Sequence, residues 1–211
     1  MKEEINPKNK NILYTGKGDN GTTTLFHCDQ GRISKSASII EALGALDELN
    51  AYLGVVKVYS LDEHLKIPIK EPPVLKAMAS QIKYISYDSV LSDIQQTLFI
   101  IQAQVAGSDI VVSKENLKSI EDVLKMISDL LPPITSFTVS GGSILSAELD
   151  FSRTLARRAE RRIVQIEVDG IKKLDEMTVT YLNRLSSVLF AMSRYANHLL
   201  SIPEDHPKYN K

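Results

Sequence analysis

The stretch SIIEALGALDELNAYLGVVKVY, residues 38–59, carries the clearest periodic pattern in the chain. Its apolar residues recur at steps of three and four positions, which places them along one face of a helix. The pattern starts at Ser38 and fades at about Tyr59, and it therefore predicts a helix of that extent. The residues on the predicted buried face are Ala42, Leu46, Leu49, Leu53 and Val56.

Four further segments show the same helical period, and each starts at a residue that can accept hydrogen bonds from the free N–H groups of a helix end. The residues expected at these starts are, in chain order, Asp88 or Ser89, Ser113, Ser143 and Thr178. The third of the five helices should continue until Pro132 and Pro133 stop it, and the fourth should reach about Glu167. Five amphipathic helices without convincing alternating strands predict an all-α five-helix bundle.

An irregular segment rich in glycine and threonine precedes this bundle and is expected to form an ordered loop or short strands. We assign residues 1–35 to this segment and residues 36–202 to the helical bundle. With 211 residues and a hydrophobic content of 43%, the chain is long enough for one substantial core and short for two. Residues 1–211 are therefore expected to form a single domain.

Charge and cysteine content exclude several classes of function. The 25 basic and 26 acidic residues nearly cancel, so no overall field favours nucleic acid or a membrane surface as a partner. Cys28 is the only cysteine, which excludes an intrachain disulfide and a cysteine metal cluster and fits a reducing compartment. No apolar run approaches the roughly 20 residues of a membrane span, so a cytoplasmic location is expected. None of the four histidines shows metal-ligand spacing, and all are expected to be structural or solvated, namely His27, His64, His198 and His206.

The segment YTGKGDNGTTT, residues 14–24, combines three glycines, a lysine and four threonine hydroxyls. Glycine lets backbone N–H groups approach an anion closely, and hydroxyl and lysine side chains bind phosphate oxygens, so this composition favours a phosphate site. Gly16, Gly18 and Gly21 match G-x-G-x-x-G, but no βαβ unit surrounds them. Thr22 stands where a Walker A sequence needs lysine. A plain surface turn is the alternative interpretation.

Arginine is concentrated in the predicted fourth helix, which holds five of the chain's eight arginines between residues 153 and 162. Arg153, Arg157 and Arg161 share one helical face, with Glu160 beside them. A guanidinium group can bind phosphate through two parallel hydrogen bonds, which favours an anion site on this face. An exposed face with i,i+4 ion pairs and a nucleic-acid surface are the alternatives. The residues expected on the opposite, apolar face are Phe151, Leu155, Ala159 and Ile166.

Five motifs occur in the order and spacing of one known family, namely YTGKGDNGTTTLF, EALGALDELNA, FTVSGGS, RTLARRAERR and YLNRLSSVLF. With these motifs the chain resembles the PduO-type ATP:corrinoid adenosyltransferases over nearly its whole length. The resemblance implies a homotrimer of helical bundles with active sites in the clefts between subunits. It also implies transfer of the 5′-deoxyadenosyl group from ATP to Co(I) of a reduced corrinoid, with Mg²⁺ carried mainly by the ATP phosphates. With cobalamin as the corrinoid, the products are adenosylcobalamin and triphosphate.

The same resemblance implies roles for individual residues. Asp47 and Arg153 match an ion pair between subunits, and Phe137 matches an aromatic residue that closes over the lower face of the corrin ring. Together with Phe137, Arg157 and Arg161 are expected to be catalytic. Without the resemblance, Asn183 in the predicted fifth helix would be expected to be a polar core residue with its hydrogen bonds satisfied. The residues matched to ATP binding are Thr15, Gly16, Lys17, Gly18, Asp19, Thr23, Thr24, Lys35, Arg157, Arg158, Glu160, Arg161 and Asn183.

The chain departs from the family pattern at Ser187, where aspartate is common, and at Ser140, where proline is common. The first removes a negative charge near the site, and the second is expected to loosen the loop that carries Phe137. The implied partners are a reductase that supplies Co(I) and an enzyme that uses adenosylcobalamin. Two other functions stay open: a non-catalytic helical trimer that binds ATP or adenosylcobalamin as a sensor or carrier, and a structural bundle whose arginines only join subunits.

Overall fold

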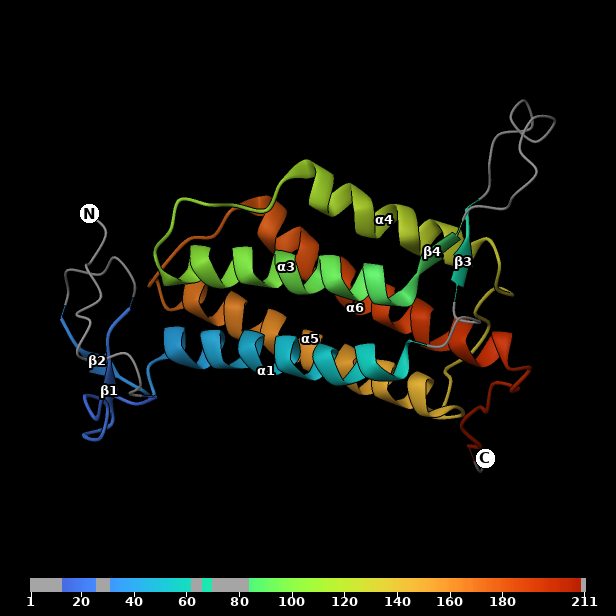
Figure 1. Cartoon of the computed structure of the whole chain (residues 1–211), viewed down its shortest axis with the longest axis horizontal. Coiled ribbons are helices and arrows are strands. Elements are labelled where there is room, and N and C mark those ends of the chain that lie inside the picture. The colour runs from blue at the N-terminus through green and yellow to red at the C-terminus, as the bar shows by residue number, and fades with distance from the viewer. Residues whose placement is uncertain (1–12, 26–30, 62–65, 70–83, 210–211) are drawn as a thin grey trace.

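The computed structural model describes residues 13–25, 31–61, 66–69 and 84–209, and within them the chain forms five helices and two small two-stranded sheets. Figure 1 shows the helices side by side in one elongated bundle. The predicted all-α bundle with an irregular N-terminal segment is confirmed. Cys28, His27 and His64 lie outside the described residues. The helices are α1 (Ser38–Tyr59), α3 (Tyr87–Ala106), α4 (Lys114–Ser128), α5 (Ile144–Val168) and α6 (Glu176–Leu199).

Two helix starts agree with the prediction. Ser113 caps α4 and Ser143 caps α5, each by accepting a hydrogen bond from the backbone N–H three residues later. Ser113 also forms a capping box, because the Asn116 side chain accepts from the Ser113 N–H in return. The end of α4 at Ser128 comes before Pro132, so the proline does not itself stop the helix.

Two other predicted starts are wrong by a few residues. Neither Asp88 nor Ser89 caps α3, because Ser86 accepts a hydrogen bond from the N–H of Ser89 at 3.1 Å. Likewise α6 starts after Asp175, whose side chain is the cap, and Thr178 lies fully buried in the first turn. In both cases a serine or aspartate slightly earlier in the chain is the better placed acceptor, and it decides the start.

Short strands complete the fold. β1 (Thr22–Thr23) pairs antiparallel with β2 (Ile33–Ser34), in keeping with the loop or short strands expected for the glycine-rich segment. β3 (Lys66–Pro68) pairs antiparallel with β4 (Tyr84–Ser86) between α1 and α3, and this second pair was not predicted. Strands of three residues are too short to show the alternation of polar and apolar residues by which a strand is identified in a sequence.

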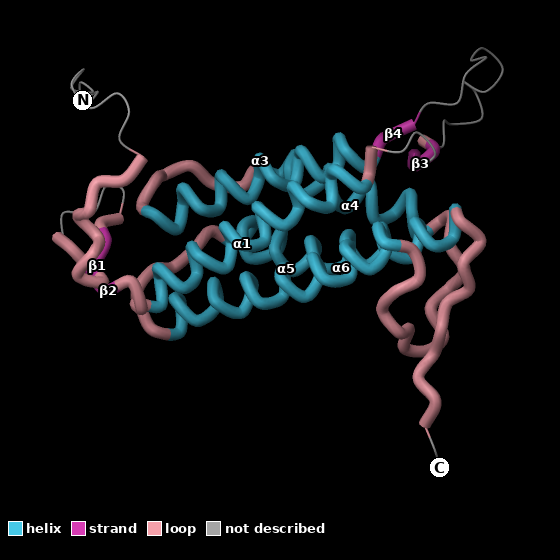
Figure 2. Tube along the Cα trace, turned by 60° about the horizontal axis from the view of Figure 1, so that its bottom comes forward, coloured by secondary structure: helices cyan, strands magenta, loops and turns pink. Residues whose placement is uncertain are grey.

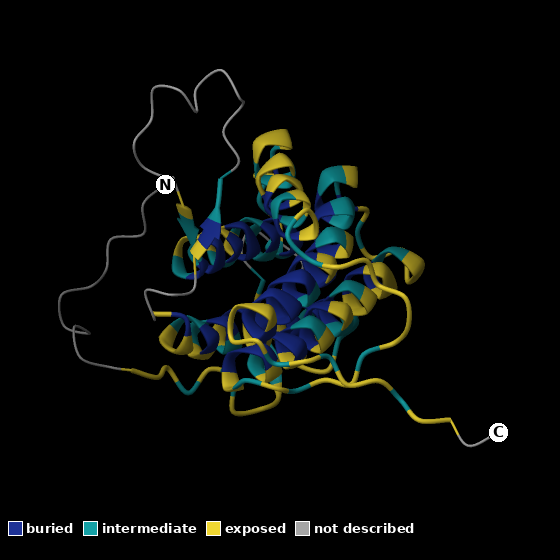
Figure 3. Ribbon diagram, turned by 90° about the vertical axis from the view of Figure 1, so that its right-hand side faces the viewer, coloured by how far each residue is buried: buried dark blue, intermediate teal, exposed yellow. Residues whose placement is uncertain are grey.

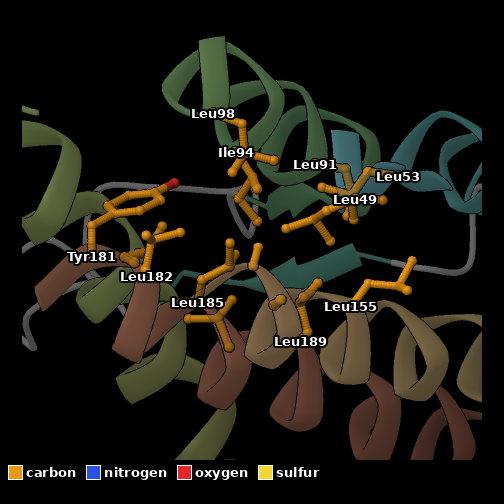
Figure 4. Packing of buried hydrophobic residues seen from close by; sticks show 14 of the residues in the cluster. Leu49, Leu53, Leu91, Ile94, Leu98, Leu155, Tyr181, Leu182, Leu185 and Leu189 are labelled. Atoms are coloured by element: carbon orange, nitrogen blue, oxygen red, sulfur yellow. The ribbon is translucent and has the colours of Figure 1, made fainter. Parts of the chain in front are cut away.

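The core lies between the helices, and Figure 4 shows buried side chains from α1, α3, α5 and α6 meeting there. All five residues on the predicted face of α1 are fully buried, which confirms that face. On α5, Leu155, Ala159 and Ile166 are buried as predicted. The prediction is wrong for Phe151, which is 50% exposed because it lies at the edge between α5 and α1, where its ring packs edge-on against Tyr52. Figure 3 shows the buried residues in the centre of the bundle and the exposed ones outside.

Two irregular regions lie at opposite ends of the bundle. Figure 2 shows the segment with β1 and β2 at one end, and the loops near the C-terminus at the other. α1 and α5 run antiparallel, with the Ser38 hydroxyl donating to the Asp169 carboxylate at 2.7 Å. Hydrogen bonds from Ser38 and Gln165 lower the pKa of Asp169.

No helix in the described part of the chain is long and apolar enough to cross a membrane.

Candidate functional site

The glycine-rich segment, residues 14–24, forms two tight turns and is called the glycine loop below. The N–H of Asp19 donates to the carbonyl of Gly16 at 3.2 Å, and the N–H of Gly21 donates to the carbonyl of Gly18 at 3.1 Å. Gly16 and Gly21 have φ angles of 67° and 76°, where a side chain would crowd the backbone. The turns themselves therefore require two of the three glycines.

Arg32 holds the glycine loop in place and was not among the predicted site residues. Its Nε donates to the Thr22 hydroxyl at 2.7 Å, and its Nη2 donates to the carbonyl oxygens of Thr22, at 2.8 Å, and of Lys17. One guanidinium thus joins both parts of the loop, because its donors point in fixed directions. The Asn20 Oδ1 adds a local bond by accepting from the Thr22 hydroxyl at 2.6 Å. The one sequence feature that distinguishes Arg32 is that it is the only arginine before the arginine-rich helix.

Lys35 lies directly beside the glycine loop. A Cβ on Gly18 would lie 3.0 Å from the Lys35 Nζ, so glycine at this position lets the ammonium group approach the loop backbone. Lys35 also lines a groove of about 710 Å³ between the glycine loop, α1 and α3, a volume suited to a small molecule. Much of the groove surface is apolar, for example Phe99 on α3. The predicted site residues that line this groove are Thr23, Thr24, Lys35 and Asp47.

The arginines of α5 divide between two faces. Arg158 and Arg162 form ion pairs with Glu48 and Glu41 of α1, as the alternative interpretation of a surface ion-pair face expects. The role of Arg158 in ATP binding stays a prediction. Arg157 and Arg161 are exposed, and no residue in the described ranges forms an ion pair with either. Their guanidinium donors are therefore available to an anion from outside the chain.

Arg153 lies on the same face as Arg157 but has partners within its own chain. Its Nε donates to the buried Asp150 carboxylate at 3.1 Å, and its guanidinium carbon lies 5.7 Å from the centre of the Phe190 ring. Asp47, its predicted partner, lines the groove beside the glycine loop instead. The ion pair between Asp47 and Arg153 is thus not formed within one chain.

Glu160 and Asn183 are brought together between α5 and α6. The Nδ2 of Asn183 donates to the Glu160 Oε1 at 2.9 Å. Asn183 is exposed, so it is not the satisfied core residue that the fifth helix alone suggested. A neighbouring bond from Arg184 to the Asn183 Oδ1, at 3.0 Å, fixes which side of the amide faces Glu160.

A second groove of about 370 Å³ follows the arginine face. Phe137 lines it and is 80% exposed, so its ring is available to a ligand rather than to the core. Ser187 also lines this groove, and no carboxylate does so among the described residues. The groove therefore combines apolar surface with positive charge. Its lining residues include Phe137, Arg153, Arg157, Ser187 and Phe190.

Within one chain the glycine loop and the arginine face do not meet. Asp169 lies level with Ser38, next to the glycine loop, and Arg157 precedes Asp169 by 12 positions. At about 1.5 Å of rise per residue, Arg157 lies roughly 18 Å further along the bundle. The structure thus brings Lys35 to the loop and Phe137 to Arg157, but it leaves these two groups apart.

Comparison with known proteins identifies the relatives of this chain. The sequence model of the family described as cobalamin adenosyltransferase matches residues 13–196, a range that contains both grooves. The chain is 32% identical over 193 residues to corrinoid adenosyltransferase PduO of Citrobacter freundii, covering 88% of this chain and 50% of that protein. It therefore spans about half the length of that relative. It is 29% identical over 189 residues to the corrinoid adenosyltransferase of Bacillus subtilis, covering 88% of this chain and 86% of that protein.

A solved structure is similar over almost the full length of both chains. It is a variant of the PduO-type ATP:corrinoid adenosyltransferase from Lactobacillus reuteri complexed with cobalamin and ATP. The TM-score is 0.77 at 26% sequence identity, and the match covers 95% of this chain and 98% of that chain. Fold and sequence thus lead to the same relatives.

Proposed function

Because this chain belongs to the cobalamin adenosyltransferase family, we propose that it transfers the 5′-deoxyadenosyl group of ATP to the cobalt of a reduced corrinoid. The lone pair of Co(I) forms the new bond to C5′ while the bond from C5′ to oxygen breaks, so triphosphate leaves with the electron pair. With cobalamin as the acceptor, the product is adenosylcobalamin. The similar Lactobacillus reuteri protein, which was solved with cobalamin and ATP, supports both substrates.

The observation that carries the proposal is that one chain holds two groups of candidate anion donors that lie apart along the bundle. The glycine loop offers backbone N–H groups, hydroxyls and Lys35, while α5 offers Arg157 and Arg161 without carboxylate partners among the described residues. A complete site forms if the glycine loop of one copy meets the arginine face of the next. A head-to-tail contact of this kind forms a ring when the rotation between successive copies closes. We take this ring to be a homotrimer, with Asp47 and Arg153 paired across the seam.

The positive side chains act on the leaving group. Negative charge builds on the triphosphate as its bond to C5′ breaks, and Lys17, Arg157 and Arg161 stabilise that charge without reorganising. The glycine loop and the Glu160–Asn183 pair hold ATP in line with the cobalt, which contributes by orientation. No protein nucleophile is needed, because Co(I) attacks directly.

Phe137 serves the preceding step, the reduction of Co(II). A lower axial ligand makes Co(II) harder to reduce, and an apolar ring over that face excludes water and the base of the corrinoid itself. The exposure of Phe137 and its position beside Phe190 in the second groove support this role.

Magnesium, partners and location complete the proposal. Mg²⁺ would be bound mainly by phosphate oxygens of ATP, the hard oxygen ligands that it prefers. A reductase must supply Co(I), and an enzyme that uses adenosylcobalamin would receive the product. A cytoplasmic location agrees with the single cysteine.

One experiment separates this function from its alternatives. The protein is incubated without oxygen with ATP, Mg²⁺ and chemically reduced cobalamin, and the visible spectrum is followed. The transferase converts the Co(I) spectrum into that of an alkylcobalamin and releases triphosphate. A sensor or carrier binds without turnover, and a structural bundle binds no nucleotide, so either result would contradict the proposal.

A mixing experiment tests whether the site lies between copies. Lys35→Ala and Arg157→Ala chains each lack one half of every site, and Arg157→Ala alone should lose about 10²- to 10³-fold in turnover. Refolded together in equal amounts, they should regain about one quarter of the activity, because that share of head-to-tail contacts pairs two intact halves. The same mixture made with Arg162→Ala in place of Arg157→Ala is the control. No regained activity would show that both halves belong to one chain.

A further inference from the structure

The loop that carries Phe137, residues 132–142, is held at its two ends by α6 and is called the Phe137 loop below. The Nη2 of Arg194 donates to the Pro132 carbonyl at 3.1 Å, and the Nδ2 of Asn197 donates to the Gly141 carbonyl at 2.8 Å. The exposed ring of Phe137 gains little direction from packing against the core. Bonds to the backbone at the centre of the loop must therefore decide where the ring points.

The centre of the Phe137 loop is bonded to residues 203–206, which follow α6 and are called the C-terminal clamp below. The Val139 N–H donates to the Asp205 carbonyl at 2.8 Å. The Nδ1 of His206 lies 2.9 Å from the Phe137 carbonyl oxygen and 3.0 Å from the Ser136 hydroxyl oxygen. A carbonyl only accepts, so the bond to Phe137 is made by the tautomer that carries its proton on Nδ1. The clamp thus holds the loop on both sides of Thr138.

The clamp is itself anchored to α6. The Arg194 guanidinium is buried, and it pairs with Glu204 through Nε while Nη2 holds Pro132. The Ile202 N–H donates to the Asn197 carbonyl at 2.9 Å. The two residues of α6 that hold the ends of the Phe137 loop therefore also hold Glu204 of the clamp and Ile202 directly before it. Because the clamp follows residue 196, it lies beyond the range that the family model matches.

We propose that the C-terminal clamp positions Phe137 over the second groove, with His206 as a positioning residue that acts through the Phe137 carbonyl. The inference rests on the proposed role of Phe137 in the corrinoid step. Without the His206 bond, the centre of the loop samples more conformations, and the ring spends less time over the corrin face. The bonds that hold the clamp are made to the Phe137 loop and to α6 and include none of the groups proposed to bind ATP, so ATP binding should be unaffected.

Hydrogen exchange of the protein without substrates tests the clamp itself. In His206→Ala the Val139 amide should exchange about fivefold faster, the factor that corresponds to one neutral hydrogen bond. His206→Asn should restore most of the protection, because the Asn Nδ2 can donate from nearly the position of the histidine Nδ1. Lys208→Ala, a change at an exposed neighbour, is the control and should leave exchange unchanged. Equal exchange in wild type and His206→Ala would overturn the inference.

A double-mutant cycle with bound Co(II) cobalamin tests the functional consequence. The spectrum of bound Co(II) reports whether a lower axial ligand is present. His206→Ala should shift this spectrum toward the form with the axial ligand. It should also lower the turnover that starts from Co(II) about fivefold, while the KM for ATP stays unchanged. In a Phe137→Ala background, His206→Ala should have no further effect, and additive losses would overturn the inference. A Co(II) spectrum that Phe137→Ala does not change would overturn it as well. Failure of the proposed function looks different, since wild type would then form no alkylcobalamin from Co(I).

Discussion

The glycine loop and the Phe137 loop both carry candidate site residues, but they are held in different ways. The glycine loop is held by side chains close to it in sequence, chiefly Asn20 and Arg32. The Phe137 loop is held by α6 and by His206, 69 residues further along the chain. The glycine loop therefore takes its conformation from residues nearby in sequence, whereas the Phe137 loop takes its conformation only in the assembled bundle.

This difference separates the expected effects of mutations. Changes around the glycine loop should alter ATP binding and leave the bundle intact, because few of its bonds reach the core. Changes around the Phe137 loop should alter stability as well, because its anchors Arg194 and Asn197 are buried in α6. Three substitutions test this contrast between the two loops, and they are given in order of decreasing expected change in free energy.

Gly142→Ala should have the largest effect and should destabilise the fold by about 3 kcal/mol. A Cβ at Gly142 would lie 2.5 Å from the Nδ2 and Oδ1 of Asn197, and the φ angle there is 101°. Asn197 cannot move away easily, because its amide also bonds Gly141 and Ser143. Chemical denaturation measures the loss.

Gly141→Ala is the matched control for that substitution. Its φ angle of 133° is also strained for a side chain, but nothing lies within 4 Å of the added Cβ, so the loss should be only about 1 kcal/mol. Equal losses at Gly141 and Gly142 would show that backbone strain, rather than contact with α6, controls this loop.

Arg32→Ala should have the second largest effect. It should weaken the free energy of ATP binding by about 2 kcal/mol and leave the stability of the fold unchanged. Removal of a charged donor that joins Lys17 and Thr22 should raise the KM for ATP roughly thirtyfold and leave the KM for the corrinoid unchanged. Arg32→Lys should recover little, because an ammonium cannot reproduce the fork of guanidinium donors. An unchanged KM for ATP in Arg32→Ala would contradict the positioning role.

Gly21→Ala should have the smallest effect, about 1 kcal/mol. Its φ angle of 76° disfavours a side chain, yet nothing lies within 4 Å of the added Cβ. The cost should therefore stay local and appear as a modest rise in the KM for ATP with the same midpoint of thermal unfolding. A large drop in that midpoint would mean that the glycine loop depends on the bundle after all.

The sequence predicted the helices well because each has a long apolar face. All five predicted segments are helical, and the buried face of α1 was correct at every position. The starts of α3 and α6 were predicted late, because Ser86 and Asp175 compete with the residues that were expected to cap them. The β3–β4 pair escaped prediction because three residues carry too little periodicity.

The candidate site was predicted in part. The shared face of Arg157 and Arg161 and the composition of the glycine loop are local features, so helical spacing and residue type revealed them. Arg32 was missed because a single arginine before a short strand gives no pattern. His206 was expected to be structural or solvated, and its bond to the Phe137 carbonyl depends on a contact between distant segments.

The sequence by itself determined what short-range physics controls, namely five amphipathic helices, the turns of the glycine loop and a row of guanidinium groups on α5. Only the tertiary structure decided how these parts face one another. Antiparallel packing of α1 and α5 puts Arg158 and Arg162 against glutamates and leaves Arg157 and Arg161 open, at a distance from the glycine loop. Helical period sets the direction of a side chain about its own helix, but the neighbour that it meets depends on how the whole bundle closes around its core.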